Sequence, residues 1–483
     1  MKKLESFFAL TVLLMTTSSS AATLYVSNSS GNNSGNCTSQ TSPCKSIVYA
    51  IGRMSGGDTL EIAAGIYSGV SNTVGAEFGA TEIPSGSASA YTIIKASEDG
   101  TVDISAPFAP TASNYFQLEG LKLSNIYHGV AGHHIKIFRT AIVNGDSNGN
   151  VVAFSIGTNE STPGATHILL EDVWVYGPGG RYDILIYNSE DVVIRRAVLR
   201  HDGGWNFDGS NPEASINIYN SRRVELQNVI VIDAISSNND VYAAAFYNIK
   251  NDSSGTIHAD TRIVGSIAFN NSIGNSFAYE GGGSITNAVL ENSVSYNGAG
   301  LTTNNGPVTL QVRNVTMVGG GSNAFSEFSN NSNVSVTNSI IHQYGGEAFN
   351  NITSQSNNNC SSGCSLSFNP ETNGLLYLPR IEVGSTLASS GSPSGQVGAK
   401  ITNKVGLSGT YYGETGFNVE QGSLWPWPLE DRIYADLCST RNDGLCDGNS
   451  ASLTDYIWSA LGNGTPGNIQ PMPKPTGVNI IKN

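Results

Sequence analysis

A repeated alternation of apolar and polar residues runs through the middle of the chain. Each copy reads apolar, any, apolar, any, then a polar residue or glycine, and then a second, mostly apolar run. Alternation with a period of two is typical of a β-strand that buries one face. The copies begin at Phe116, Ile137, Ile168, Val192, Val224, Thr261, Ala288, Leu310 and Val334. The pattern therefore predicts pairs of short strands separated by a tight turn.

The polar or glycine residue between the two runs, here called the anchor, recurs every 20 to 37 residues. The residue two positions before each anchor is apolar every time. An apolar column with this period requires an interior made by stacked coils, as in a parallel β-solenoid. The predicted anchors are Gly120, Thr140, Asp172, Arg196, Asn228, Gly265, Asn292, Asn314 and Asn338.

The N-terminal segment adds a second signature. Leu24-Tyr25-Val26-Ser27 precedes a helix-like run at 46–54, which is followed by Gly57-Asp58-Thr59-Leu60 and Gly65-Ile66-Tyr67. With the repeats, this opening resembles secreted proteins of the pectate-lyase-like superfamily. The resemblance implies an all-β, right-handed, single-stranded parallel β-helix over residues 23–400, with the helix-like run as its N-terminal cap. Because this framework serves lyases, glycoside hydrolases and adhesins, it implies a fold more specifically than an activity.

The composition changes after Pro370, and residues 401–483 are predicted to form a C-terminal extension. Residues 395–401 have the character of a last coil, and 424–433 and 453–461 predict a small helical tail. Trp425 and Trp427 are separated by proline. We expect them to anchor this tail onto the solenoid rather than to bind sugar.

The first 22 residues have the composition of a secretory signal peptide. Lys2 and Lys3 precede a short apolar stretch, and small residues follow before Thr23. The apolar stretch is too short to span a bilayer. We therefore expect an exported protein, extracellular or periplasmic, without a membrane span.

Six cysteines in an exported chain predict disulfide bonds. Pairing between near neighbours is the simplest of the fifteen possible connectivities. A zinc site is the competing interpretation, but no pair has a histidine partner at zinc-finger spacing. The predicted pairs are Cys37 with Cys44, Cys360 with Cys364, and Cys438 with Cys446.

The charge balance excludes two classes of partner. Lys and Arg number 24 against 38 Asp and Glu, which gives a net charge of −14, and charged residues make up only 13% of the chain. A protein that binds nucleic acid or anionic lipid needs a basic surface, and none is evident. An acidic surface suits a neutral polysaccharide, or an anionic one held through calcium, the one candidate cofactor. A glycan is therefore the expected partner, and the oligomeric state stays open.

Two consecutive long intervals, from 196 to 228 and from 228 to 265, mark the predicted site. Extra residues in a coil form loops on the flank of a solenoid. Residues five beyond successive anchors stack, so His201 is predicted to lie above Asp233 and to act as general acid or base. The alternative is an ordinary turn ladder of side-chain hydrogen bonds that continues through Asn270 and Asn297. The candidate catalytic residues are His201, Asp202, Asp233, Arg200 and Lys250.

Acidic side chains in these coils allow two chemistries. A pair of carboxyl groups flanking a glycosidic bond would support hydrolysis. Grouped around calcium, with Asp208 and Asp240 as candidate ligands, they would bind a uronate and acidify its neighbouring carbon. Lyases of the superfamily typically use a lysine or arginine base, which Lys250 or Arg200 can supply. No family motif matches residue for residue, so a non-catalytic, adhesin-like glycan-binding solenoid is the alternative function.

Aromatic residues suggest a sugar-binding row that is independent of catalysis. Tyr187 and Tyr219 stand at matching offsets after Ile-x-Ile, and Tyr247 is the candidate next member. Exposed, these rings would stack against sugars, whereas buried they would form an internal stack, and the pattern leaves both open. Trp205, in a glycine-flanked segment between His201 and Asp208, is the other candidate sugar-stacking residue.

Overall fold

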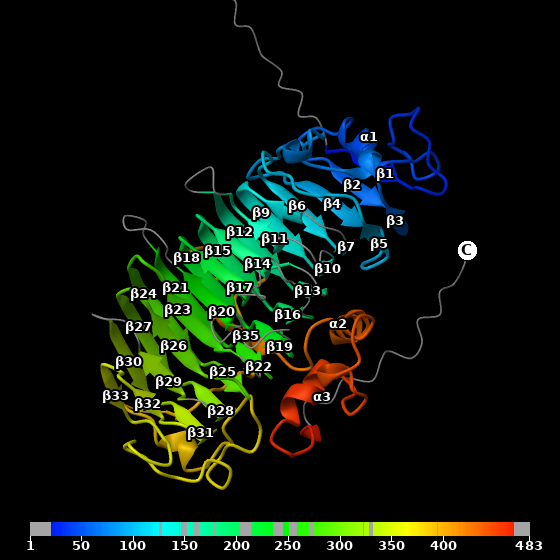
Figure 1. Cartoon of the computed structure of the whole chain (residues 1–483). Helices are drawn as coiled ribbons and strands as arrows, with labels where there is room; N and C mark the ends of the chain where they lie inside the picture. Colours follow the sequence, from blue (N-terminus) through cyan, green and yellow to red (C-terminus); the bar gives the residue numbers. More distant parts are fainter. Residues whose placement is uncertain are drawn as a thin grey trace, which may run out of the picture.

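Figure 1 shows the computed structural model of the chain, an elongated stack of coils with two helices against one side. The structure describes residues 21–124, 128–143, 145, 152–158, 164–177, 180–202, 214–234, 245–250, 258–270, 274–321, 323–327, 332–393 and 395–467. Within residues 245–250, the side chains of 247 and 249 are described. The predicted signal peptide therefore lies almost entirely outside the described residues.

Three sheets, called A, B and C, form the walls of a parallel β-helix, which confirms the predicted fold class. They contain 13, 11 and 9 strands, and the strands within each sheet pair in parallel. From β6 to β32 each coil contributes one strand to each sheet in the order A, B, C, whereas β1–β5 and β33 belong to sheets A and B only. Stacking of coils lets each one bury its apolar face against its neighbours.

The strands of the three sheets are bounded as follows. Sheet A contains β1 (Thr23–Val26), β2 (Thr59–Ile62), β4 (Thr92–Ala96), β6 (Phe116–Glu119), β9 (Gly132–Phe138), β12 (Ala165–Glu171), β15 (Glu190–Arg195), β18 (Arg222–Gln227), β21 (His258–Val264), β24 (Ile285–Glu291), β27 (Val308–Arg313), β30 (Asn333–Thr337) and β33 (Ser354–Ser356). Sheet B contains β3 (Gly65–Tyr67), β5 (Val102–Ile104), β7 (Leu121–Leu123), β10 (Ala141–Val143), β13 (Trp174–Gly177), β16 (Val198–His201), β19 (Ile230–Ile232), β22 (Ile267–Phe269), β25 (Val294–Tyr296), β28 (Thr316–Gly320) and β31 (Ile340–Tyr344). Sheet C contains β8 (His128–Val130), β11 (Val152–Ile156), β14 (Tyr182–Tyr187), β17 (Ala214–Tyr219), β20 (Ala245–Lys250), β23 (Phe277–Glu280), β26 (Leu301–Asn304), β29 (Phe325–Glu327) and β32 (Phe349–Asn350).

The predicted apolar column lies inside sheet A and forms part of the core. Its members pair strand by strand and are almost fully buried. In the second copy the register pairs Ile137, not Phe138, with Leu118 and Leu170. The prediction was one residue out there, and the turn residue of that coil is Arg139 rather than Thr140. The column runs through Leu118, Ile137, Leu170, Ile194, Leu226, Ile263, Leu290, Val312 and Val336.

The anchors are the turns that lead from sheet A to sheet B. With Arg139 in place of Thr140, all nine have a positive φ, between 48° and 68°. Glycine, asparagine and aspartate adopt this left-handed conformation most readily, which explains the residue types in the pattern. The two arginines there are held by carboxylates: Arg139 Nε lies 2.6 Å from Asp99, and Arg196 Nε lies 2.6 Å from Asp172.

The N-terminal end is closed by the predicted cap helix, α1 (Ile47–Ile51). Ile47, Ala50 and Ile51 are buried against the first coil. Short 3₁₀ turns follow at η1 (Val70–Asn72) and η2 (Ala76–Phe78). A cap of this kind covers core side chains that the first coil would otherwise expose.

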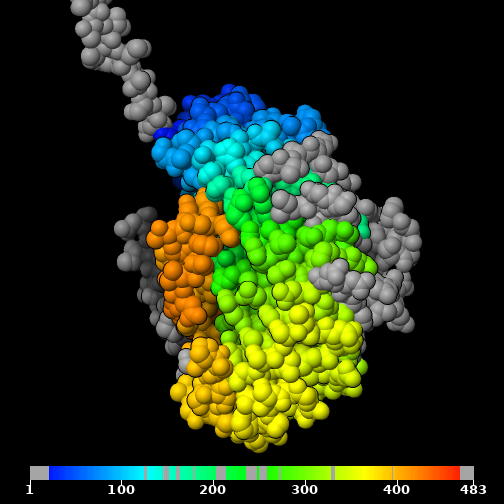
Figure 2. Space-filling view, turned by 90° about the vertical axis from the view of Figure 1, so that its left-hand side faces the viewer, coloured from blue at the N-terminus to red at the C-terminus, as the bar shows by residue number. Residues whose placement is uncertain are grey.

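The C-terminal extension begins earlier than predicted. The last strand of sheet A ends at Ser356, and residues 390–405 fold back along the turns between sheets A and B instead of forming a last coil. Anchor side chains bind this segment: the amide of Asn292 donates to Lys400 O at 2.8 Å, and that of Asn338 donates to Ser392 O at 3.0 Å. Figure 2 shows the extension, in orange, along the flank of the coils coloured cyan to green.

The extension then covers the outer faces of sheets A and B. Its elements are η3 (Leu387–Ser389), the antiparallel pair β34 (Asn403–Val405) and β35 (Glu420–Ser423), α2 (Glu430–Leu437), η4 (Gly444–Cys446) and α3 (Leu453–Trp458). On sheet A, the buried Arg195 guanidinium donates to Leu407 O at 2.5 Å and to Phe417 O at 3.0 Å. Trp425 and Trp427 are buried with the outer residues of sheet B, as expected for anchors of the tail.

The three predicted disulfide bonds are confirmed, with Cys37–Cys44, Cys360–Cys364 and Cys438–Cys446 paired. Every cysteine is therefore in a disulfide, which leaves no thiolate for the alternative zinc site. Across the described ranges, no helix is both long enough and apolar enough to cross a membrane.

Candidate functional site

Arg200 and Asp202 lie under the C-terminal extension, away from any exposed flank. The Arg200 side chain is 0% exposed, and its Nε donates to Asp202 at 2.6 Å. Its Nη2 donates to Leu437 O at 2.5 Å, and Asp202 also accepts from Thr440 at 2.9 Å. These contacts give the pair a structural role in holding the extension, in place of the base and acid roles that the sequence predicted.

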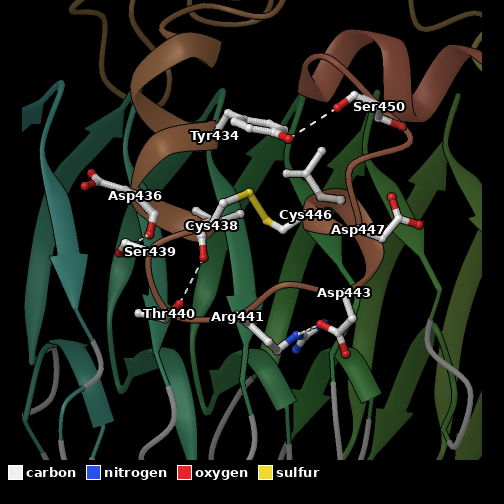
Figure 3. The surroundings of a disulfide bond; sticks show 12 residues. Tyr434, Asp436, Cys438, Ser439, Thr440, Arg441, Asp443, Cys446, Asp447 and Ser450 are labelled. Atoms are coloured by element: carbon white, nitrogen blue, oxygen red, sulfur yellow. Dashed lines mark hydrogen bonds and ion pairs between the residues drawn. A yellow bond between two sulfur atoms is a disulfide. The ribbon is translucent and has the colours of Figure 1, made fainter.

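The loop that hydrogen-bonds to Arg200 and Asp202 is closed by the disulfide Cys438–Cys446 (Figure 3). In Figure 3, Arg441 lies beside Asp443 at the far end of the loop from the two sulfur atoms. Arg441 Nη1 donates to Asp202 at 3.2 Å, and its Nη2 donates to Asp233 O at 2.7 Å. One guanidinium thus ties together two neighbouring coils where each leaves sheet B.

His201 is buried in the same region, with a side chain only 1% exposed. Its Nε2–H donates to the carbonyl of Gly180 at 3.0 Å. Burial lowers the pKa of His201 to about 4, against weaker opposing effects of the Gly180 hydrogen bond and the Asp202 charge. A buried imidazole that is neutral at pH 7 cannot reach a substrate, so the predicted acid or base role does not fit this position.

Asp233 belongs to a turn ladder, the ordinary alternative that the sequence left open. Asn270 Nδ2 donates to Asp233 at 3.1 Å, and Asn297 Nδ2 donates to Asn270 at 3.1 Å. The Asp233 carboxylate also accepts from Tyr456 Oη at 2.6 Å and from the Leu445 N–H at 2.9 Å. Burial is the largest influence and raises the pKa of Asp233. These hydrogen bonds give Asp233 a structural role.

Several predicted site residues cannot be placed. Trp205, Asp208 and Asp240 lie outside the described residues. The backbone of Lys250 is described, and its register sets it between Tyr219 in one neighbouring coil and Glu280 in the other. Within the described ranges, no group of three or more His, Cys, Asp or Glu residues is arranged to hold a metal ion. The described residues therefore form no calcium site by themselves.

Tyr187 and Tyr219 form an aromatic pair on the outer face of sheet C. They are paired in register, with ring centroids 4.9 Å apart and planes at 85°. Both are partly exposed, whereas Ile186 and Ile218 beside them are buried in the core. Tyr247 does not extend this row: it pairs with Ile216 and is 0% exposed, so its predicted sugar contact is wrong.

Three polar residues on the same two strands were not singled out from the sequence. Asp183 of β14, and Ser215 and Asn217 of β17, are buried, with 0%, 2% and 0% of their surface exposed. They alternate with the core isoleucines of their strands and so belong to the outer face of sheet C. The alternation in Ile216-Asn217-Ile218-Tyr219 carries this information, because Asn217 has the same parity as Tyr219.

In the described part of the chain, the extension packs on sheets A and B. The described hydrogen bonds of residues 400–461 with the solenoid run to strands of sheets A and B and to the turns that border them. The outer face of β14 and β17 carries the partly exposed tyrosine pair, and the backbone of Lys250 is in register with Tyr219. This face is therefore the candidate functional site.

Comparisons with solved structures return carbohydrate-active enzymes with parallel β-helix folds. The pectate lyase Pel9A is 15% identical, with a TM-score of 0.47 over 79% of this chain and 97% of that one. A rhamnogalacturonan lyase is 13% identical, with a TM-score of 0.36 over 74% and 91% of the two chains. The GH136 lacto-N-biosidase from Eubacterium ramulus is 11% identical, with a TM-score of 0.37 over 72% and 68%. No protein-family model and no curated protein sequence matches the chain. At these levels of similarity, the fold assignment rests on the strand pairings described above.

Proposed function

We propose that this protein is exported and acts on an extracellular polysaccharide that lies across the outer face of sheet C. The observation that carries the proposal is the tyrosine pair: Tyr187 and Tyr219 are partly exposed and in register on the outer face of sheet C. Phenol rings offer an apolar face to the C–H groups of a sugar and a hydroxyl to its oxygens. Three disulfides support an oxidising compartment outside the cytoplasm.

Lys250 is the proposed catalytic base, because its register position continues the tyrosine row. In an elimination, its neutral amine takes the proton from the carbon beside a uronate carboxylate. The C–O bond to the next sugar then breaks, a C=C bond forms in the uronate ring, and the departing oxygen takes a proton from water. Asp208 and Asp240 remain the proposed ligands if calcium is required to hold the uronate.

A non-catalytic glycan-binding protein is the second candidate. It is favoured by the positions of Arg200, Asp202 and Asp233, which hold the extension and are unavailable for chemistry. A binding protein needs the tyrosine pair and the polar surface around it, but not Lys250 or a metal.

The test combines binding and product analysis on a panel of uronate-containing and neutral polysaccharides, with calcium and with chelator. We expect binding that Tyr219→Ala weakens, and unsaturated products that Lys250→Ala abolishes without loss of binding. Tyr25→Ala, on the first coil, is the control. Reducing ends without unsaturation would replace elimination by hydrolysis, and binding without products would favour the second candidate. Absence of binding across the panel would contradict the proposed function.

A further inference from the structure

Ala22, the residue before β1, takes part in the first coil of the solenoid. Its carbonyl accepts from the Thr59 N–H at 2.8 Å, which continues the hydrogen bonding between β1 and β2 by one residue. It has the same parity as Leu24, and it packs, partly buried, against the core. Figure 1 shows these two strands at the end of the stack that carries α1. Ala22 is therefore part of the folded domain, although the sequence assigned it to the predicted signal peptide.

The backbone nitrogen of Ala22 binds a buried carboxylate. It donates to Oδ1 of Asp58 at 2.7 Å, and Oδ2 of the same side chain accepts from the Ser55 N–H at 2.7 Å. Asp58 is 7% exposed. None of the described lysines and arginines forms an ion pair with it. The described part of the chain thus gives this carboxylate two backbone partners and no positive charge.

A chain that begins at Ala22 would supply the missing charge. A buried carboxylate is costly unless it is both hydrogen-bonded and paired with a cation. A free α-amino group is an ammonium ion at pH 7, because its ordinary pKa is about 7.7–8.0. At Ala22 this group would stand where the backbone nitrogen already lies 2.7 Å from Asp58. The neutral hydrogen bond would then become a charge-assisted one, which is about twice as strong.

The sequence allows cleavage on either side of Ala22. A signal peptidase requires small side chains at the first and third positions before the bond that it cleaves. Cleavage after Ala21 would use Ala21 and Ser19, and cleavage after Ala22 would use Ala22 and Ser20. All four side chains are small, so this requirement does not choose between the two bonds.

The contacts of the first coil favour one of these bonds. Cleavage after Ala22 would remove the residue that donates to Asp58 and accepts from Thr59. Cleavage after Ala21 keeps both hydrogen bonds, and the residue that it removes from the described part of the chain is exposed. A protein that ends its leader at Ala21 therefore retains every described contact of the first coil that Ala22 makes.

We propose that a signal peptidase cleaves the chain between Ala21 and Ala22 and that the new α-ammonium group of Ala22 pairs with Asp58. Hydrolysis of this peptide bond consumes one water molecule. It leaves a carboxylate on Ala21, in the released leader, and an ammonium group on Ala22. The inference rests on the export that forms part of the proposed function, and it moves the end of the predicted signal peptide from Ala22 to Ala21.

The first experiment identifies the cleaved bond. The full chain is expressed in a bacterial host, and the exported protein is analysed by intact mass spectrometry and N-terminal sequencing. We expect one chain, which begins at Ala22. A chain that begins at Thr23, or at any other residue, would overturn the assigned bond. A chain that keeps its leader and stays in the cytoplasm would instead contradict the proposed export, from which this inference starts.

The second experiment tests the ion pair. Three versions of the protein, which begin at Ser19, Ala22 and Thr23, are released from a carrier by a protease that leaves no extra residue. Urea unfolding at pH 7 compares each version with its Asp58→Asn variant, which keeps the shape of the side chain and removes its charge. Only the version that begins at Ala22 has an ammonium group at that residue. There, Asp58→Asn should raise the unfolding equilibrium constant by a further factor of about ten or more relative to the other two versions.

Two controls keep this test specific. Glu61→Gln removes a carboxylate of β2 that is paired with Lys95 at 3.1 Å, and it should have the same effect in all three versions. Acetylation of the α-amino group in the version that begins at Ala22 removes the ammonium charge without changing Asp58, and it should also lower stability. An equal effect of Asp58→Asn in the three versions, or no effect of acetylation, would overturn the ion pair.

Discussion

The buried histidine of sheet B gives the protein a specific sensitivity to acid. His201 is 1% exposed, and burial lowers its pKa to about 4, whereas an unfolded histidine has a pKa of about 6.5. At a pH between these two pKa values, His201 is protonated in the unfolded chain but neutral in the folded chain. The free energy of unfolding therefore rises with pH across this window and falls as the pH drops from 6.5 toward 4.

At pH 5 this single group is expected to remove about 2 kcal/mol of the stability present at pH 7. His201→Gln should remove the sensitivity, because the glutamine amide cannot be protonated in this range and can still donate to the carbonyl of Gly180. The assay is urea unfolding of both proteins at pH 7 and pH 5. His342→Gln, which replaces a histidine paired with Glu371 outside the core, is the control and should behave like the wild type. An equal loss in wild type and His201→Gln would refute the reasoning.

Three further predictions concern the extension and the sugar site. Asp233→Gly and Asn297→Gly both place glycine at a left-handed turn of the ladder. Of these two residues, only Asp233 hydrogen-bonds to Leu445 and Tyr456 of the extension. Asp233→Gly should therefore lower the free energy of unfolding in urea by about 2–4 kcal/mol more than Asn297→Gly. Equal costs would show that the extension draws little stability from this contact. Replacing Cys438 and Cys446 together by serine should lower the free energy of unfolding by about 2–3 kcal/mol with an unchanged β-sheet circular dichroism spectrum. A lost β-sheet signal would mean that the solenoid needs this disulfide to fold. Tyr219→Ala should weaken glycan binding at least tenfold in calorimetry, whereas Tyr25→Ala should not.

Residues whose structural role depends on their neighbours in the sequence were predictable from the sequence. The anchors were found because a left-handed turn admits mainly glycine, asparagine and aspartate, and because the apolar column before them must face the core. The one misassigned anchor, Thr140 for Arg139, arose where Phe138 and Ile137 are both apolar and an arginine occupies the turn. Charge pairing with Asp99 allows that arginine, and this pairing spans 40 residues of sequence.

Residues whose environment is made by distant segments were not predictable. Arg200 and Asp233 looked like candidate catalytic groups because nothing nearby in the sequence shows that residues 437–456 cover them. Tyr247 was assigned to the wrong face because the length of the long coil hides its register with Ile216. Asn217 was missed for another reason: the alternation placed it outward, but its lack of hydrogen-bond partners is a property of the folded chain alone.

Hydrogen exchange with and without a bound polysaccharide tests the location of the site most directly. The ligand is the polymer of the panel that binds wild-type protein most tightly. The account predicts that binding slows amide exchange in β14 and β17, at residues 182–187 and 214–219, and leaves the extension at 403–461 unchanged. Protection confined to the extension or to the strands of sheets A and B would contradict a site on sheet C.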